Sequence, residues 1–334
     1  MITQRYDCLV LSFLLFKYIL SLQLIFPLKE TKYKVYETNV CLGTPKVCED
    51  YLISFVENSF LLTGLSRYQS NLSESASFIA GEKQNSCYDS LFFRDVLINK
   101  VYIYKTFETN AGRRGIFGFG PGNDDDNSNI AKLYKEAQGK KVFFLDLSKK
   151  ILSIGDYPDE YKIVKETGKY KYCKLIKNYS YQCNLDSIYF SSDIGIRYNH
   201  FQIDSLVTIC PQPNAIYASS AFMDLIIKEY FKEQIKEGIC LRVYSEGYLF
   251  VECKRSYDYL NDKRLKNITI ILNKFSLVLT PKELFTYHEG DIYFLIIHNP
   301  EKKGWHFGYP FLTKFLTVID EEEMQIGFIN TEHN

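Results

Sequence analysis

Residues 304–329, "GWHFGYPFLTKFLTVIDEEEMQIGFI", lie close to the end of the chain. An earlier stretch, "RRGIFGFGPG" at residues 113–122, contains the same arrangement of bulky residues directly before a glycine. The first copy consists of Gly115, Ile116, Phe117 and Gly118, and the second consists of Trp305, His306, Phe307 and Gly308. A glycine at such a point lets one backbone segment pass close to another. The repetition predicts two related halves.

The segments around the two copies favour short strands. They are rich in aromatic and β-branched residues and are separated by turn residues: 33–43, 51–56, 95–107, 140–148, 149–156, 267–280 and 291–298. Residues 127–140 and 219–238 instead show helical apolar spacing between a Ser or Asn cap and a glycine stop. The sequence therefore predicts an all-β fold with a few short helices.

Length and charge narrow the possible classes of protein. A chain of 334 residues is long for one core and sufficient for two, so two lobes are expected. The 40 basic and 40 acidic residues balance to a formal net charge of zero, and no nucleic-acid-binding motif is present. We therefore expect no nucleic-acid partner. The cysteine and histidine spacing of a metal site is also absent from the sequence, and we expect neither a metal nor a cofactor.

The N-terminus resembles a secretory signal. Arg5 precedes an apolar run from Cys8 to Phe16, and we assign residues 1–24 to the signal, with cleavage between Ser21 and Phe26. An uncleaved anchor is the alternative, because Tyr18 to Leu22 extend the apolar run, but Lys17 in the middle of the extended stretch disfavours it. No second long apolar run follows, so we expect no stable membrane span after cleavage, and a location outside the cell or in the secretory or lysosomal pathway.

Eight cysteines follow the signal, an even number that is typical of disulfide-bonded secreted proteins. Short spacing favours the pairs Cys173–Cys183 and Cys240–Cys253, and Cys41–Cys48 would pair across a Gly-Thr-Pro turn. Cys87 and Cys210 then remain. Glycosylation sequons occur at Asn71, Asn178 and Asn267.

Four stretches together resemble the pepsin-like aspartic peptidases. They are "LGTP" at 42–45, "GIFGFG" at 115–120, "KKVFFLDLSKKILSIGDYPDEY" at 140–161 and the C-terminal stretch at 304–329. The resemblance extends from Phe26 to Ile329. It implies a bilobal fold whose two lobes, residues 26–160 and 161–330, are related by a pseudo-two-fold axis.

The resemblance also implies where catalytic residues belong. In this family each lobe presents an aspartate on an Asp-Thr-Gly loop, the bulky residues and glycine pack under that loop, and the two carboxyls share a proton. Here the loops are "VENS", from Val56 and Glu57 to Ser59, and "CPQP" from Cys210. Counting from the flanking strands places Val56 and Cys210 at the aspartate positions, and Glu57 is expected to point away because neighbouring strand residues face opposite sides. The chain is thus expected to be a degenerate member that lacks both catalytic aspartates.

The family also covers its cleft with a hairpin flap, for which the sequence offers Phe78, Cys87 and Tyr88. The resemblance places Cys87 and Cys210 across the cleft from each other, either bridged or both free. We favour two free thiols. A disulfide requires Cα atoms within about 7 Å of each other, and a flap that covers a peptide is expected to stand farther from the loop of the other lobe.

Three functions remain open at this stage. The first is a catalytically inactive pseudopeptidase that binds a peptide, glycan or protein through the inter-lobe cleft. The second is an active aspartic-type endopeptidase with non-standard active-site residues, and the third is a structural secretory glycoprotein with a filled cleft. A monomer is expected in each case.

Overall fold

The computed structural model describes residues 23–331, apart from segments 32–34, 64–65, 79–85, 106–114, 122–127, 163–170, 178–179 and 192–196 and positions 95, 138, 158, 160, 161, 246 and 303. The predicted signal up to residue 22 and the sequon at Asn178 lie outside the described residues. Among the described residues, none of the helices combines the length and the apolar character that crossing a bilayer requires.

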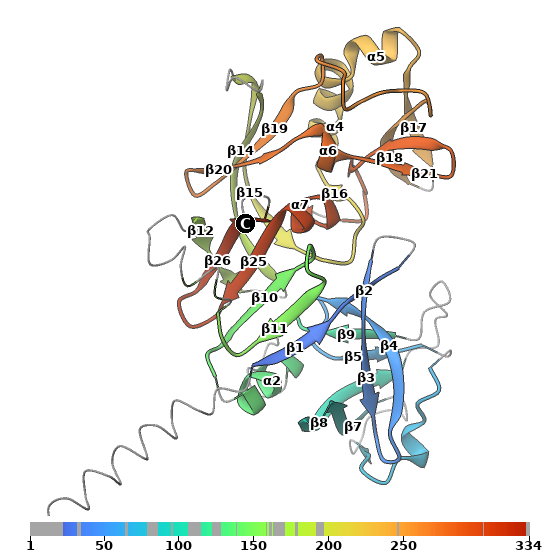
Figure 1. Cartoon of the computed structure of the whole chain (residues 1–334), viewed down its shortest axis with the longest axis vertical. Helices are drawn as coiled ribbons and strands as arrows, with labels where there is room; N and C mark the ends of the chain where they lie inside the picture. The colour runs from blue at the N-terminus through green and yellow to red at the C-terminus, as the bar shows by residue number, and fades with distance from the viewer. Residues whose placement is uncertain are drawn as a thin grey trace, which may run out of the picture.

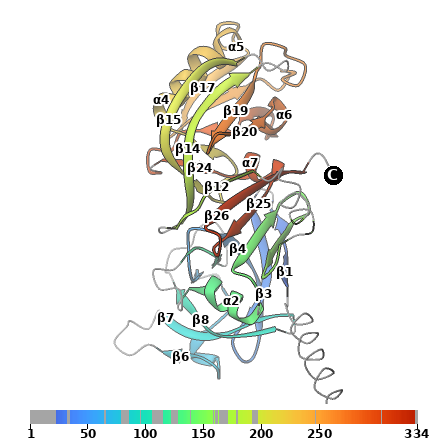
Figure 2. The same ribbon diagram turned by 90° about the vertical axis from the view of Figure 1, so that its left-hand side faces the viewer.

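Two lobes lie at opposite ends of a central six-stranded sheet (Figures 1 and 2). The strand order in this sheet is β1-β11-β10-β25-β26-β12. Its strands are β1 (Leu24–Pro27), β10 (Val142–Asp146), β11 (Ile151–Ile154), β12 (Lys171–Lys174), β25 (Phe315–Asp320) and β26 (Gln325–Asn330). Every residue of β10 and β25 is buried, as expected for strands that are covered on both faces. The all-β, bilobal prediction is confirmed.

The N-terminal lobe is built on an eight-stranded sheet with the order β2-β3-β4-β9-β5-β8-β7-β6. The bounds are β2 (Lys29–Glu30), β3 (Tyr36–Leu42), β4 (Val47–Ser54), β5 (Phe60–Leu62), β6 (Ser77–Phe78), β7 (Ser86–Phe93), β8 (Val96–Lys105) and β9 (Gly115–Gly118), with a 3-10 turn, η1 (Ser70–Leu72). Helix α2 (Asn129–Ala137) contacts β8. Ser128 caps α2 by accepting the Ala131 N–H at 3.2 Å.

The C-terminal lobe contains a second eight-stranded sheet, with the order β20-β19-β14-β15-β24-β16-β23 and β13 paired to β14, and a four-stranded sheet, β17-β18-β22-β21. The bounds are β13 (Ile176–Lys177), β14 (Tyr181–Ser191), β15 (Arg197–Ile209), β16 (Ile216–Tyr217), β17 (Cys240–Ser245), β18 (Tyr248–Cys253), β19 (Asn267–Leu272), β20 (Phe275–Leu279), β21 (Phe285–His288), β22 (Asp291–Phe294), β23 (Ile296–Ile297) and β24 (Trp305–Phe307). Short helices α6 (Pro281–Leu284) and α7 (Tyr309–Lys314) complete the lobe.

The helix expected at residues 219–238 is divided into three pieces. They are α4 (Ser220–Leu225), a π-helical turn η2 (Ile226–Tyr230) and α5 (Lys232–Lys236). The widened turn lets both Tyr230 and Phe231 be buried beside Phe294, at ring distances of 5.5 and 5.0 Å. Packing of these adjacent aromatic residues therefore prevails over a regular helical repeat.

Strand β1 begins earlier than the sequence analysis assumed. Leu24, assigned to the end of the signal, pairs with Ile154 and is buried. The folded part of the chain thus includes Leu24.

Two of the three predicted disulfides are present. Cys41–Cys48 and Cys240–Cys253 each join directly paired positions of an antiparallel hairpin. The predicted Cys173–Cys183 bridge is not formed, and both thiols are free and buried. Cys173 lies on β12 of the central sheet and Cys183 on β14 of the C-terminal lobe. The two thiols are nevertheless neighbours, because burial and then the hydrogen bond to the Cys183 thiol raise the pKa of Cys173.

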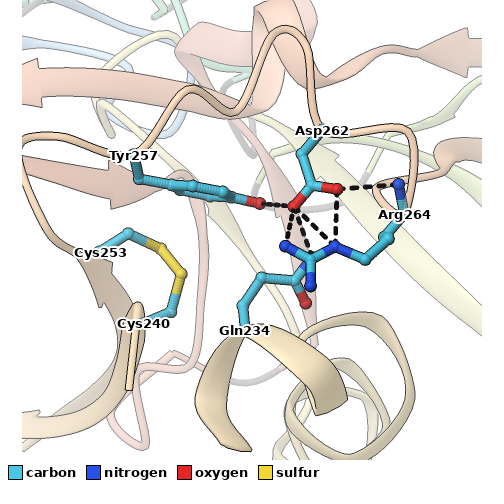
Figure 3. Close-up of a disulfide and its surroundings, with 6 residues drawn as sticks. All are labelled: Gln234, Cys240, Cys253, Tyr257, Asp262 and Arg264. Carbon is cyan, nitrogen blue, oxygen red and sulfur yellow. Dashed lines mark hydrogen bonds and ion pairs between the residues drawn. A yellow bond between two sulfur atoms is a disulfide. The ribbon is translucent and has the colours of Figure 1, made fainter. Parts of the chain in front are cut away.

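A buried carboxylate fixes the loop beside the second disulfide (Figure 3). Asp262 accepts hydrogen bonds from the Arg264 backbone N–H at 2.9 Å, from Arg264 Nη2 at 2.8 Å, from the Tyr257 hydroxyl at 2.8 Å and from Gln234 Nε2 at 3.1 Å. Burial alone would raise the pKa of Asp262, but these donors hold the pKa well below its usual range.

We expect Asp262→Asn to lower the free energy of unfolding by about 2 kcal/mol at pH 7, because hydrogen bonds to a charged acceptor are lost. A carboxyl whose folded pKa is depressed stabilises the fold above its unfolded pKa of about 3.9, and the stabilisation disappears as the pH falls below that value. The difference between wild type and variant should therefore shrink between pH 5 and pH 2 in urea titrations. Asp224→Asn, at an exposed carboxylate, is the matched control and should change little at either pH.

Candidate functional site

The first bulky-Gly element forms strand β9 and lies between two strands of the N-terminal lobe. β4 runs parallel to it, with Leu52 paired to Ile116, Ile53 to Phe117 and Ser54 to Gly118. β5 runs antiparallel to it on the other side, with Leu61 paired to Ile116. Residues 55–59 form the loop that joins β4 to β5 across the end of β9.

The second bulky-Gly element repeats this arrangement in the C-terminal lobe. β15 runs parallel to β24, with Thr208 paired to His306 and Ile209 to Phe307. β16 runs antiparallel to β24, with Tyr217 paired to His306. Residues 210–215 connect β15 to β16.

The glycine of each element lies directly under the loop of its lobe. A Cβ on Gly118 would stand 2.4 Å from the Glu57 carbonyl oxygen, and one on Gly308 would stand 2.3 Å from that of Ala215. The loops are held by backbone hydrogen bonds, from Gly118 N–H to Ser59 O at 3.0 Å and from Tyr309 N–H to Pro213 O at 2.9 Å. The close approach predicted for these glycines is therefore present.

The pairing of β4 with β9 and of β15 with β24 changes which residues of the two loops correspond to each other. Ser54 pairs with Gly118, and Cys210, which follows the Ile209–Phe307 pair, stands at the level of Gly308. The antiparallel side agrees, because Leu61 and Tyr217 occupy matching positions and lie equally far along the chain from Ser54 and Cys210. The counterpart of Cys210 is thus Ser54, two residues before Val56.

Ser54 and Cys210 both anchor their loops from buried positions. The Ser54 hydroxyl accepts the N–H groups of Val56 and Glu57, each at 3.2 Å. Cys210 is 5% exposed, and its N–H donates to Phe307 O at 3.1 Å. Burial raises the pKa of the Cys210 thiol to about 11, so this thiol is neutral at acidic and neutral pH.

The tip of the first loop is accessible. Val56 is 38% exposed although the residues before it are buried, and Glu57 is half-buried. The negative charge of Glu57 contributes to the raised pKa of Cys210, while Lys302 acts in the opposite direction. The direction of the Glu57 side chain, which was expected to face away from the site, stays a prediction.

The candidate flap residues lie on two strands at the outer edge of the N-terminal lobe. Phe78 on β6 pairs with Cys87 on β7. Cys87 is a buried free thiol beside the Tyr68 hydroxyl, at 3.9 Å. The Tyr88 ring contacts the Tyr102 ring at a centroid distance of 5.6 Å. The Lys132 ammonium lies over the Tyr88 ring, 5.2 Å from its centroid.

Cys87 and Cys210 are both free, in agreement with the favoured expectation, and both are buried. Two sequons can also be located. Asn71 is exposed on η1, and Asn267 is half-buried at the start of β19.

We expect iodoacetamide to leave all four free thiols unlabelled in the native protein, because Cys87, Cys173, Cys183 and Cys210 are buried. Unfolding in urea without reductant should expose all four, while peptide mapping recovers linked Cys41–Cys48 and Cys240–Cys253. Native labelling of Cys210, or a linked Cys173–Cys183 peptide, would contradict this assignment.

Comparison by sequence finds no matching family model and no matching curated protein. Comparison by structure finds the aspartic proteinase from Irpex lacteus, with a TM-score of 0.68 over 92% of this chain and 97% of that one, at 14% identity. The fold is pepsin-like. At this level of sequence identity the similarity shows the fold alone.

The two matching loop positions do not hold the pair of aspartates that the resemblance implies. Ser54 and Cys210 are uncharged, and Glu57 is the one carboxylate within residues 54–59 and 210–215. No group of three or more metal-binding side chains occurs among the described residues. The half-exposed carboxylate of Glu57 can contact a bound molecule, but a buried hydroxyl, a buried neutral thiol and one carboxylate do not form a pair of carboxyls that shares a proton.

Proposed function

We propose that this chain is a pepsin-like protein of the secretory pathway that has lost proteolysis and binds a peptide, glycan or protein between its lobes. The observation that carries the proposal is the pairing of both loops. Ser54 and Cys210 occupy the matching positions above Gly118 and Gly308, and neither is an acid. The two hairpin disulfides support a secretory location.

Binding without catalysis fits the exposed loop tip. Val56, Glu57 and Asn58 are accessible in an otherwise buried segment, so an apolar side chain, a carboxylate and an amide are available to a ligand. The active endopeptidase is the alternative. It would require Glu57 to act with a second acid, and the second loop has none among residues 210–215.

An array of random decapeptides and a glycan array, probed with the labelled protein, test this proposal. We expect ligands whose binding is lost in Val56→Arg, because a long charged side chain would occupy the loop tip. Leu241→Arg, at a 57% exposed residue on β17, is the matched control and should bind as wild type does. If no member of either array binds, or if both variants weaken binding equally, inter-lobe recognition is wrong and the structural glycoprotein is favoured.

A further inference from the structure

A cavity of about 720 Å³ lies beside helix α2, and no residue of the two loops is among its lining residues. Its lining comes from β8, from α2, from residues 139–141, from β13 and from the turn between β25 and β26. Figure 2 shows α2 next to this turn, and the Tyr134 hydroxyl of α2 donates to Glu321 of the turn at 3.2 Å. The cavity therefore lies between the N-terminal lobe and the central sheet.

Lysines outnumber glutamates in the lining of this cavity. Five lysines and three glutamates line it, a net charge of +2 in a chain whose net charge is zero: Lys100, Lys132, Lys135, Lys141, Lys177, Glu136, Glu321 and Glu322. No arginine is among the lining residues.

Two of the three carboxylates already have partners within the protein. Glu321 pairs with Lys177 at 2.6 Å and accepts the Tyr181 hydroxyl at 2.9 Å. Glu322 accepts the Lys141 backbone N–H at 2.9 Å. Among the described residues, no carboxylate lies within ion-pair distance of the ammonium groups of Lys100 or Lys132.

Lys132 is held in place without an anion. Its ammonium donates to the Lys100 backbone carbonyl and lies 5.2 Å from the centroid of the Tyr88 ring. Burial, and then the charge of Lys100, lowers the pKa of Lys132. The positive charges of the two lysines thus repel each other at a fixed site, and a bound anion would relieve that repulsion.

We propose that this cavity binds a small polar molecule carrying a phosphate or sulfate ester, whose charged group lies between Lys100 and Lys132. A phosphate monoester carries close to two negative charges at neutral pH, which matches the net charge of the lining. Ammonium groups bind such oxyanions as point charges and need no planar partner. The volume lies within the range of sites for sugar-sized or drug-sized ligands. This inference is independent of the proposed function.

Calorimetric titration of the full protein at low salt with glucose 6-phosphate, glucose 6-sulfate, inorganic phosphate and glucose tests the proposal. We expect the two esters to bind at least tenfold more tightly than inorganic phosphate, no binding of glucose, and weaker binding at high salt. Lys100→Gln/Lys132→Gln should weaken ester binding at least tenfold. Lys232→Gln/Lys236→Gln, which removes two exposed charges from α5, should leave ester binding unchanged.

Several results would overturn the proposal: no ester binding, inorganic phosphate binding as tightly as the esters, or equal losses in the two double variants. Thermal unfolding of each unliganded variant should match wild type, which separates lost binding from lost folding.

Discussion

The purified protein is expected to leave denatured haemoglobin and a fluorogenic peptide uncleaved at every pH from 3 to 7, and to show no calorimetric binding of pepstatin. Proteolysis in a pepsin-like fold requires two carboxyls that share a proton, one to activate water and one to polarise the scissile carbonyl. The matching loop positions here hold the Ser54 hydroxyl and the Cys210 thiol, whose pKa of about 11 keeps it neutral over this range.

Two variants make the activity assay decisive. Ser54→Asp/Cys210→Asp should remain inactive, because the Ser54 oxygen accepts two loop N–H groups whereas Pro213, at the position that matches Glu57, has no N–H to donate. Glu57→Gln removes the one carboxylate within residues 54–59 and 210–215. Pepstatin-sensitive turnover by wild type that disappears in Glu57→Gln would establish an active endopeptidase and refute the loss of proteolysis.

Gly308→Ala is expected to destabilise the protein by about 3 kcal/mol or more. The added Cβ would meet the carbonyl oxygens of Ala215 and Pro213 at 2.3 and 2.4 Å, so the loop that carries Cys210 would have to move away from β24. That movement would strain the hydrogen bond from Tyr309 N–H to Pro213 O. Urea unfolding followed by tryptophan fluorescence measures the effect directly, because Trp305 is the single tryptophan of the chain and lies on β24.

Asn214→Ala is the matched control for this substitution, since Asn214 is an exposed residue of the same loop. Its unfolding midpoint should stay close to that of wild type. Gly118→Ala should behave as Gly308→Ala does, because its Cβ would meet the Glu57 carbonyl at 2.4 Å. A Gly308→Ala protein as stable as Asn214→Ala would show that the loop does not depend on this close approach.

Local patterns in the sequence were sufficient for the architecture. The bulky residues before Gly118 and Gly308, the β-branched segments and the turn residues all act through neighbouring parts of the chain. Strands form within the expected segments 33–43, 95–107, 140–148 and 149–156, whereas the segment 267–280 divides into β19 and β20 and β4 ends at Ser54, inside the segment 51–56. The pairs Cys41–Cys48 and Cys240–Cys253 were predictable for the same reason. A short antiparallel hairpin brings its two ends together whatever the rest of the chain does.

Features that depend on distant partners could not be obtained in this way. Counting along the sequence placed Val56 at the aspartate position of the first loop. The pairing of β4 with β9 instead places Ser54 opposite Gly118. Cys173 and Cys183 lie on strands of different sheets, and their neighbouring thiols are unbridged in the structure. The lysine-lined cavity combines five segments that share no motif. In each case the register or packing of segments far apart in the chain sets the outcome, because side-chain proximity follows from the pairing of strands and not from their spacing in the sequence.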